Sequence, residues 1–142
     1  MSGHLFYILG LLILIFNFYS LFNYSKIFAV NFWAKEFGKV TGKSPITSEF
    51  RSKEEYNTYV SFNLISGLDF LWFLMGLVTN SWYIFLGIIV LSFTLRFILN
   101  MINLEIITKY VGLAFVSLKF LVILALIINH FHLHINWIDL VK

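Results

Sequence analysis

Four long apolar segments dominate the hydropathy pattern of this chain. They cover residues 4–24, 56–78, 82–104 and 111–131, and polar residues are sparse within them. A helix of about 20 apolar residues, rising about 1.5 Å per residue, crosses the roughly 30 Å of hydrocarbon in a bilayer. The pattern therefore predicts an all-α integral membrane protein with four transmembrane helices in a bundle, as a single membrane domain over residues 1–142.

The connection between the first two spans, residues 25–55, is long and basic. Its first half repeats apolar residues at spacings of three and four: Val30, Trp33, Phe37 and Val40. This stripe predicts an amphipathic helix, for which two interpretations are open. The helix either lies in the membrane interface or extends the first span and packs on its neighbours.

Short polar motifs mark where the helices begin and end. Gly42 and Pro45 should end the helix in the basic loop. Ser52 and Glu55 have the S-x-x-E spacing of a capping box, which predicts a helix start just before the second span. Ser81 suits the N-cap of the third span.

The basic residues are distributed unevenly between the connections, and this predicts the topology. Six of them lie between the first and second spans: Lys26, Lys35, Lys39, Lys43, Arg51 and Lys53. No charge lies between the second and third spans. By the positive-inside rule the basic loop faces the cytoplasm or a matrix-like compartment, with both termini on the opposite side. This predicts a bacterial plasma membrane or an organelle inner membrane.

Four lysines of this loop are expected to contact lipid headgroups: Lys26, Lys35, Lys39 and Lys43. The net charge of +3 does not indicate nucleic-acid binding, because most basic residues lie beside the spans. The first span lacks a basic n-region and an A-x-A-like site, so we expect a retained anchor rather than a cleaved signal peptide.

Three charged residues, Asp69, Arg96 and Lys119, lie near the middle of separate apolar runs. An unpaired charge in hydrocarbon costs several kcal/mol, so they are expected to meet in a polar layer inside the bundle. Asn17 and Asn100 lie on the polar faces of their own helices and should join this layer. Arg96 is the expected partner of Asp69, because its planar fork binds a carboxylate with two hydrogen bonds. Lys119 would then remain for an anion, a lipid phosphate or a carboxylate of another chain.

Three histidines are candidate ligands for a metal or a haem, and Asp139 is the nearby carboxylate that could support them. His130 and His134 have the i, i+4 spacing of helical ligands, and His4 is predicted on the same side of the membrane. Their position beside Trp137 favours the interpretation that they are polar residues of the membrane interface. No metal or cofactor is therefore predicted.

The chain has no catalytic signature. It contains no cysteine and no P-loop, G-x-G-x-x-G, H-E-x-x-H or G-x-S-x-G motif. The preferred hypothesis is a non-catalytic, multi-pass membrane subunit that stabilises or helps to assemble a larger complex, for instance an energy-transducing one. Its partners would be membrane lipids and other membrane protein subunits. The alternative is a small proton or anion transporter or channel that uses the layer of Asp69, Arg96 and Lys119.

Overall fold

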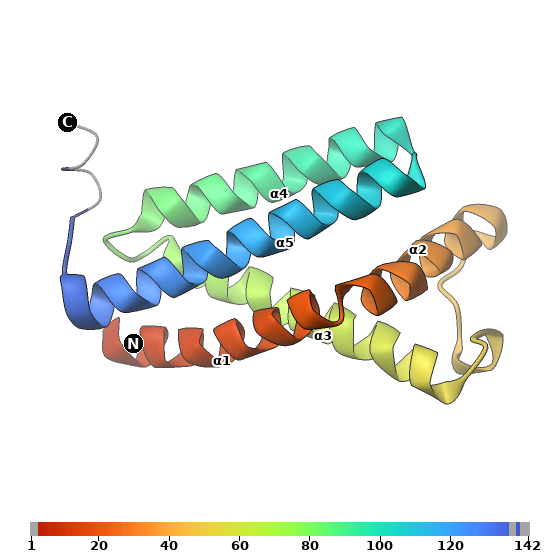
Figure 1. Ribbon diagram of the computed structural model, residues 1–142, viewed down its shortest axis with the longest axis horizontal. Helices are drawn as coiled ribbons and strands as arrows, with labels where there is room; N and C mark the ends of the chain where they lie inside the picture. Colours follow the sequence, from red (N-terminus) through yellow and green to blue (C-terminus); the bar gives the residue numbers. More distant parts are fainter. Residues whose placement is uncertain (1–2, 137–138, 140–142) are drawn as a thin grey trace.

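The computed structural model describes residues 3–136 and residue 139. These residues form five α-helices and no strand, which confirms the all-α prediction (Figure 1). The helices are α1 (Gly3–Phe22), α2 (Tyr24–Thr41), α3 (Lys53–Gly76), α4 (Trp82–Ile102) and α5 (Glu105–Ile128). A 3₁₀ turn at Thr47–Glu49 precedes α3, and a π-helical turn at Asn129–Leu133 continues α5.

Four helices are long and apolar enough to cross a membrane: α1, α3, α4, and α5 with its π-helical turn. Each overlaps one of the four predicted segments, and three of them both begin and end within about three residues of the expected positions. The fourth begins earlier than expected, at Glu105 rather than near residue 111. The reason is that Asn103 takes a left-handed conformation (φ 52°) and ends α4. The chain therefore reverses within two residues and enters α5 at once.

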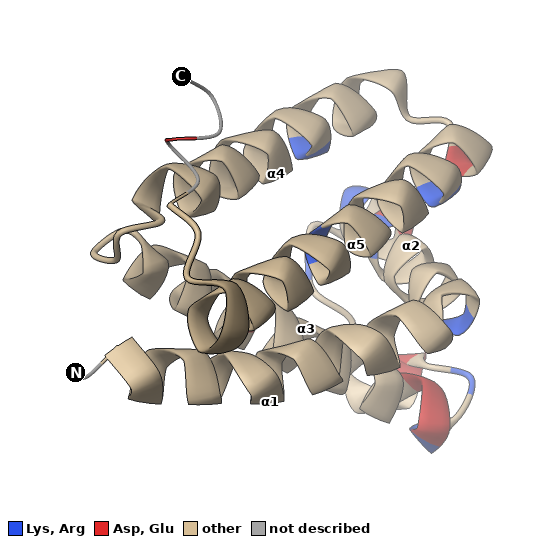
Figure 2. Ribbon diagram, turned by 60° about the vertical axis from the view of Figure 1, so that its left-hand side comes forward, with Lys and Arg blue, Asp and Glu red and all other residues tan. Residues whose placement is uncertain are grey.

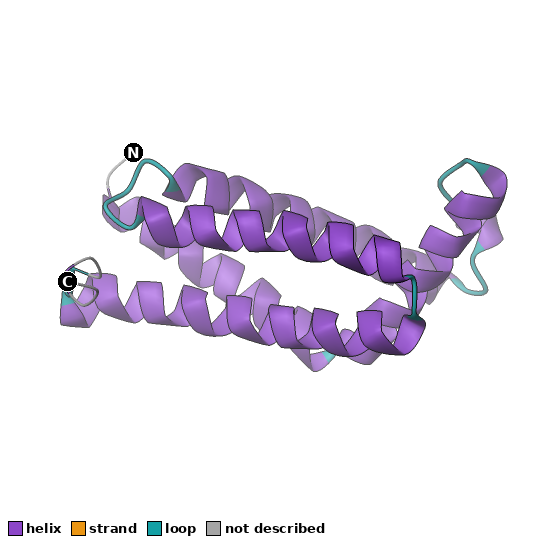
Figure 3. Cartoon of the chain, turned by 90° about the horizontal axis from the view of Figure 1, so that it is seen from above, coloured by secondary structure: helices purple, strands orange, loops and turns teal. Residues whose placement is uncertain are grey.

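The helix α2 continues α1 after a single non-helical residue, Asn23, and the two are joined by a bend (Figure 1). It packs against α3 and α5, as the extension interpretation expected. Its buried side chains are Ile27, Val30 and Ala34. The predicted stripe was wrong at its end, where Val40 is 86% exposed. Figures 1 and 3 show that the last turns of α2 extend past the α4–α5 turn. Val40 lies in the last of these turns.

Three of the predicted helix ends can be compared with the structure. Gly42 ends α2 in the left-handed region (φ 71°), and its N–H donates to the Gly38 carbonyl at 2.8 Å. The Ser52 hydroxyl accepts a hydrogen bond from the Glu55 N–H at 3.2 Å, which confirms the predicted N-cap of α3. Ser81 occupies the N-cap position of α4, but its side chain makes no capping hydrogen bond.

The hydrophobic core lies near the chain termini, where α1, α3, α4 and α5 converge. The rings of Phe6 and Trp72 stack with centroids 4.8 Å apart, and the Trp72 indole N–H donates to the Phe6 carbonyl at 3.1 Å. Phe85 packs edge-on against Trp72 and closes over Gly76. Because a β-carbon on Gly76 would overlap the Phe85 ring, this glycine permits the close approach of α3 and α4.

The opposite end of the molecule is polar and much more open. Figure 2 shows that the charged residues gather around α2, the start of α3 and the α4–α5 turn. In α4 only Phe85 and Ile88 are buried, so the half of this helix after Ile88 has no buried side chain. The helices are thus tightly packed at one end and leave space between α3, α4 and α5 towards the other.

Candidate functional site

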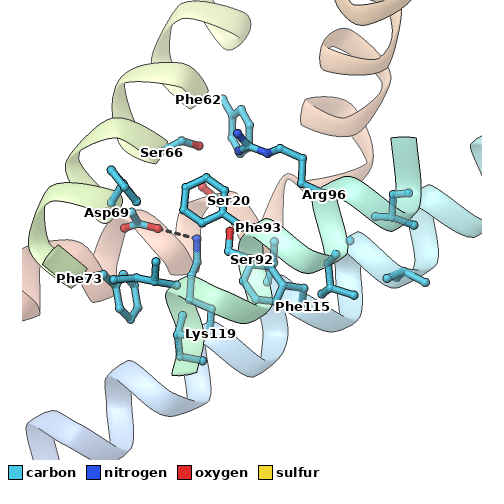
Figure 4. Close-up of a pocket in the computed structure, with 18 of the residues that line it drawn as sticks. Ser20, Phe62, Ser66, Asp69, Phe73, Ser92, Phe93, Arg96, Phe115 and Lys119 are labelled. Carbon is cyan, nitrogen blue, oxygen red and sulfur yellow. Dashed lines mark hydrogen bonds and ion pairs between the residues drawn. The ribbon is translucent and has the colours of Figure 1, made fainter. Parts of the chain in front are cut away.

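Asp69 is buried at the junction of α1, α3 and α5, and both of its carboxylate oxygens are used. Lys119 Nζ lies 2.6 Å from Oδ2 of Asp69, and the side chains are 18% and 6% exposed (Figure 4). Asn17 Nδ2 donates to Oδ1 of Asp69 at 2.7 Å and to the Ile13 carbonyl at 2.8 Å. One carboxylate therefore ties three helices together, in the polar layer that was expected for Asn17, Asp69 and Lys119.

The predicted partner of Asp69 was wrong: Arg96 does not bind it, and Lys119 does. Counting equally from the turn between the antiparallel helices α3 and α4 sets their register, and the ring contact of Phe73 with Phe85 agrees with it. In this register Arg96 is level with Phe62, about 10 Å from Asp69 along the helix axis. Figure 4 accordingly shows the Arg96 side chain reaching towards Phe62 and Ser66 rather than towards Asp69.

The lengths of the interhelical turns also explain why Lys119 lies level with Asp69 along the helix axes. Because α4 and α5 are joined only through residues 103–104, counting equally along both helices places Lys119 level with Ile88. Counting from the α3–α4 turn places Asp69 level with Ile89. Asp69 and Lys119 therefore share one level, and the packing of α5 against α1 places Lys119 beside Asn17 at the same carboxylate.

A cavity of about 550 Å³ opens beside this ion pair, between α3, α4 and α5. Its deep end is formed by Asp69 and Lys119 together with Phe73 and Ile88 of the core. Most of its wall is apolar, including the aromatic rings of Phe62, Phe70, Phe93 and Phe115. It is thus a largely hydrophobic space with polar groups at selected positions, which is the usual composition of a ligand site.

Arg96 and Asn100 both line this cavity from α4. Arg96 is exposed, and it forms no ion pair with any residue that the structure describes. The Ser20 hydroxyl also borders the cavity; it is buried and has no hydrogen-bond partner among the described residues. The Arg96 guanidinium can only donate hydrogen bonds, whereas the Ser20 hydroxyl can donate or accept.

Lys35 is a cavity residue that the sequence reasoning assigned only to lipid headgroups. It reaches the cavity from α2 and forms no ion pair within residues 3–136. Burial, and next the nearby positive charge of Lys39, lower the pKa of Lys35 below its ordinary value. Glu36 acts in the opposite direction but is hydrogen-bonded to Lys39 at 3.1 Å. The position of Lys35 follows from the packing of α2 against its neighbours. The amphipathic pattern of the sequence did not determine that packing.

The other basic residues predicted to meet lipid headgroups have different surroundings. Lys26 pairs with Glu54 at the start of α3. Lys39 donates to Glu36 and, at 2.7 Å, to the side-chain oxygen of Asn103. Lys43 is exposed beyond the end of α2. Contact of these lysines with lipid stays a prediction.

The histidines lie at the other end of the molecule. His4 Nδ1 and His130 Nε2 are 3.0 Å apart, so one ring donates to the other, and Tyr7 stacks on His130 with ring centroids 4.0 Å apart. His134 ends the π-helical turn with φ 51°. Among the described residues, no three His, Asp or Glu side chains form a group that could hold a metal ion. Trp137, which favoured the interface interpretation, lies outside the described residues.

No family model matches this chain, and no curated protein sequence or solved structure matches it significantly.

Proposed function

We propose that this protein is a non-catalytic, multi-pass membrane subunit that stabilises or helps to assemble a larger membrane complex. The observation that carries the proposal is Arg96, an exposed cation within a candidate span whose cavity supplies no acidic partner among the described residues. A charge in this position costs several kcal/mol in lipid unless another group pairs with it. The chain would therefore be stable in a membrane only when something outside it completes this site.

In this proposal α1, α3, α4 and α5 form a four-helix transmembrane bundle. The basic end of the molecule, with α2, faces the cytoplasm or a matrix-like compartment, as the positive-inside rule requires. His4 and His130 lie at the opposite face, because α1 begins where α5 ends. The membrane would be a bacterial plasma membrane or an organelle inner membrane.

The open half of α4 is the proposed contact region for the rest of the complex. Its apolar side chains are well exposed, as at Phe93, Phe97 and Met101. Helix association in membranes depends on close packing and on hydrogen bonds rather than on the hydrophobic effect. A contact region there would combine this apolar surface with Arg96 and Asn100, and the charged group would make the contact selective.

Site-specific photocrosslinking in the native membrane tests this proposal. A photoreactive phenylalanine analogue at Phe97, on the open half of α4 but outside the cavity lining, should give an adduct with a second protein of defined mass. The matched control is the same analogue at Ile15, which is similarly exposed on α1 (61%, against 67% for Phe97). Adducts of the same kind from both positions, or from neither, would count against a contact on α4.

A small anion or proton transporter is the second candidate, favoured by one specific observation. Lys35 and Arg96 line the same cavity as the buried pair of Asp69 and Lys119. Its deep end, however, stops at the aromatic core, where Phe73 and Phe85 are almost fully buried. Flux measured in vesicles of purified protein separates the two candidates: loss of flux in Asp69→Asn without loss of folding would favour the transporter.

A further inference from the structure

We infer that the cavity between α3, α4 and α5 binds one anionic phospholipid, whose phosphate is held between Lys35 and Arg96. This inference rests on the proposed membrane location and names the chemistry of the component that pairs with Arg96.

The register of α2 and α4 follows from one hydrogen bond. Lys39 Nζ donates to Asn103 Oδ1 at 2.7 Å, which fixes the height of α2 against the end of α4. Lys35 lies one turn before Lys39 on the same face of α2. On α4, Asn100 lies about one turn before Asn103, and Arg96 lies one turn before Asn100. Lys35 and Arg96 are therefore offset along the helix axes by about one turn, roughly 5 Å, and both line the same cavity.

The donors in this region suit a phosphate better than a single carboxylate. Lys35 and Arg96 provide two cations from two helices, and Asn100 and Thr108 add neutral hydrogen-bonding groups to the same wall. A phosphate presents several acceptor oxygens and binds such converging donors strongly, and an arginine fork can engage two of them. Asp69 is the one acidic residue among those that line the cavity, and it is paired with Lys119. Glu36, beside Lys35 in α2, is paired with Lys39.

The shape of the cavity indicates an amphiphile rather than a free phosphate ion. Its volume of about 550 Å³ far exceeds what one phosphate needs, and most of its lining is apolar. Phe62 and Phe93 extend the wall beside Arg96, where an acyl chain would lie. Lys35 stands at the basic end of the molecule, which in the proposed topology is the level of the headgroups.

Native mass spectrometry of the full chain tests the inference. The protein is purified in mild detergent with phosphatidylglycerol or with phosphatidylcholine of the same acyl chains, and the retained lipid is measured. The wild type should retain one phosphatidylglycerol in preference to phosphatidylcholine. Lys35→Gln and Arg96→Gln should each weaken retention about tenfold, as expected for the loss of one charge-assisted hydrogen bond. Equal retention of the two lipids by the wild type would overturn the inference.

Lys43→Gln is the matched control, because Lys43 is an exposed lysine at the end of α2 that does not line the cavity. Its retention of phosphatidylglycerol should equal that of the wild type; a loss as large as that of Lys35→Gln would mean non-specific attraction to a basic surface. Arg96→Lys keeps the charge and should retain more lipid than Arg96→Gln. If Arg96→Gln does not fold, Lys35→Gln and the wild-type preference decide the result.

Inorganic phosphate distinguishes the two sources of the same chemistry. Because the acyl chain should contribute to binding, an excess of inorganic phosphate should leave the lipid in place, and displacement at low concentration would contradict a lipid site. The proposed function fails independently: a chain that retains phosphatidylglycerol but crosslinks to no protein supports the lipid site alone. A crosslinked complex without retained lipid would support the subunit role and overturn the lipid site.

Discussion

Asp69 holds three helices through one carboxylate, and this is the feature of the molecule most sensitive to a single substitution. Its two oxygens bind Lys119 of α5 and Asn17 of α1, while the residue itself belongs to α3. Removing one partner of a buried ion pair leaves the other charge without compensation, which is far more costly than replacing both partners. The role of the pair is thus best measured by comparing single and double substitutions.

Asp69→Asn should destabilise the protein by about 3–5 kcal/mol, because Lys119 would remain buried without its counterion. The double variant Asp69→Asn/Lys119→Gln should recover part of this loss, since neither residue is then charged. Thermal unfolding in detergent, combined as a double-mutant cycle, measures the coupling between the two sites. A coupling with Arg96 in place of Lys119 would show that the pairing described here is incorrect.

Tyr24 gives a pH-dependent test at the residue scale. Its hydroxyl donates to the Lys109 carbonyl at 2.8 Å, and burial raises the pKa of Tyr24 to about 12. The folded state therefore favours the neutral phenol. Its contribution to stability is complete below the unfolded pKa of about 10 and decreases as the pH rises from about 10 to about 12. The unfolding temperatures of the wild type and Tyr24→Phe should converge over this range, and a difference that does not change with pH would contradict the assignment.

At the scale of elements, the contact between α3 and α4 depends on a glycine at one place and not at another. A β-carbon on Gly76 would overlap the ring of Phe85, whereas one on Gly67, in the same helix, meets nothing within 4 Å. Gly76→Ala should therefore destabilise the protein by about 1–3 kcal/mol. Gly67→Ala is the matched control and should be neutral or stabilise by up to about 1 kcal/mol, through its higher helix propensity. Equal effects of the two substitutions in thermal unfolding would refute this packing.

Much of the helical arrangement follows from local sequence signals. Apolar length located the four long helices, and local chemistry located the cap at Ser52 and the stop at Gly42. The orientation of α2 did not follow, because an amphipathic stripe suits both an interface and a protein surface. The exposed Val40 and the buried Ala34 depend on how far α2 projects beyond its neighbours, which is a tertiary property.

The composition of the site was predicted better than its pairing. Helical faces correctly brought Asn17, Asp69 and Lys119 to one layer, but side-chain chemistry favoured Arg96 as the partner of Asp69. The short turns of the α3–α4 and α4–α5 hairpins contained the decisive signal, because equal counting from each turn puts Asp69 and Lys119 at one level. Lys35 could not be found in this way, since its place in the cavity depends on the bend at Asn23 and on the packing of α2.

At the scale of the whole molecule, tight packing and open surface are separated along the helix axes. The aromatic core near the termini and the layer of Asp69 and Lys119 hold the helices together. Beyond them α4 keeps no buried side chain, and Arg96 and Lys35 face a cavity in which the carboxylate of Asp69 is already paired with Lys119. This division is the physical basis for proposing that the protein acts as one part of a larger membrane assembly.

The most direct test of this central claim is the mass and composition of the particle that contains the chain in its native membrane. The protein should be extracted in mild detergent and its particle mass determined with the identity of every component. We expect one stoichiometric complex with other membrane proteins, well above the 16.6 kDa of the chain. Recovery of the chain alone, as a stable monomer or as a homo-oligomer, would contradict the proposal.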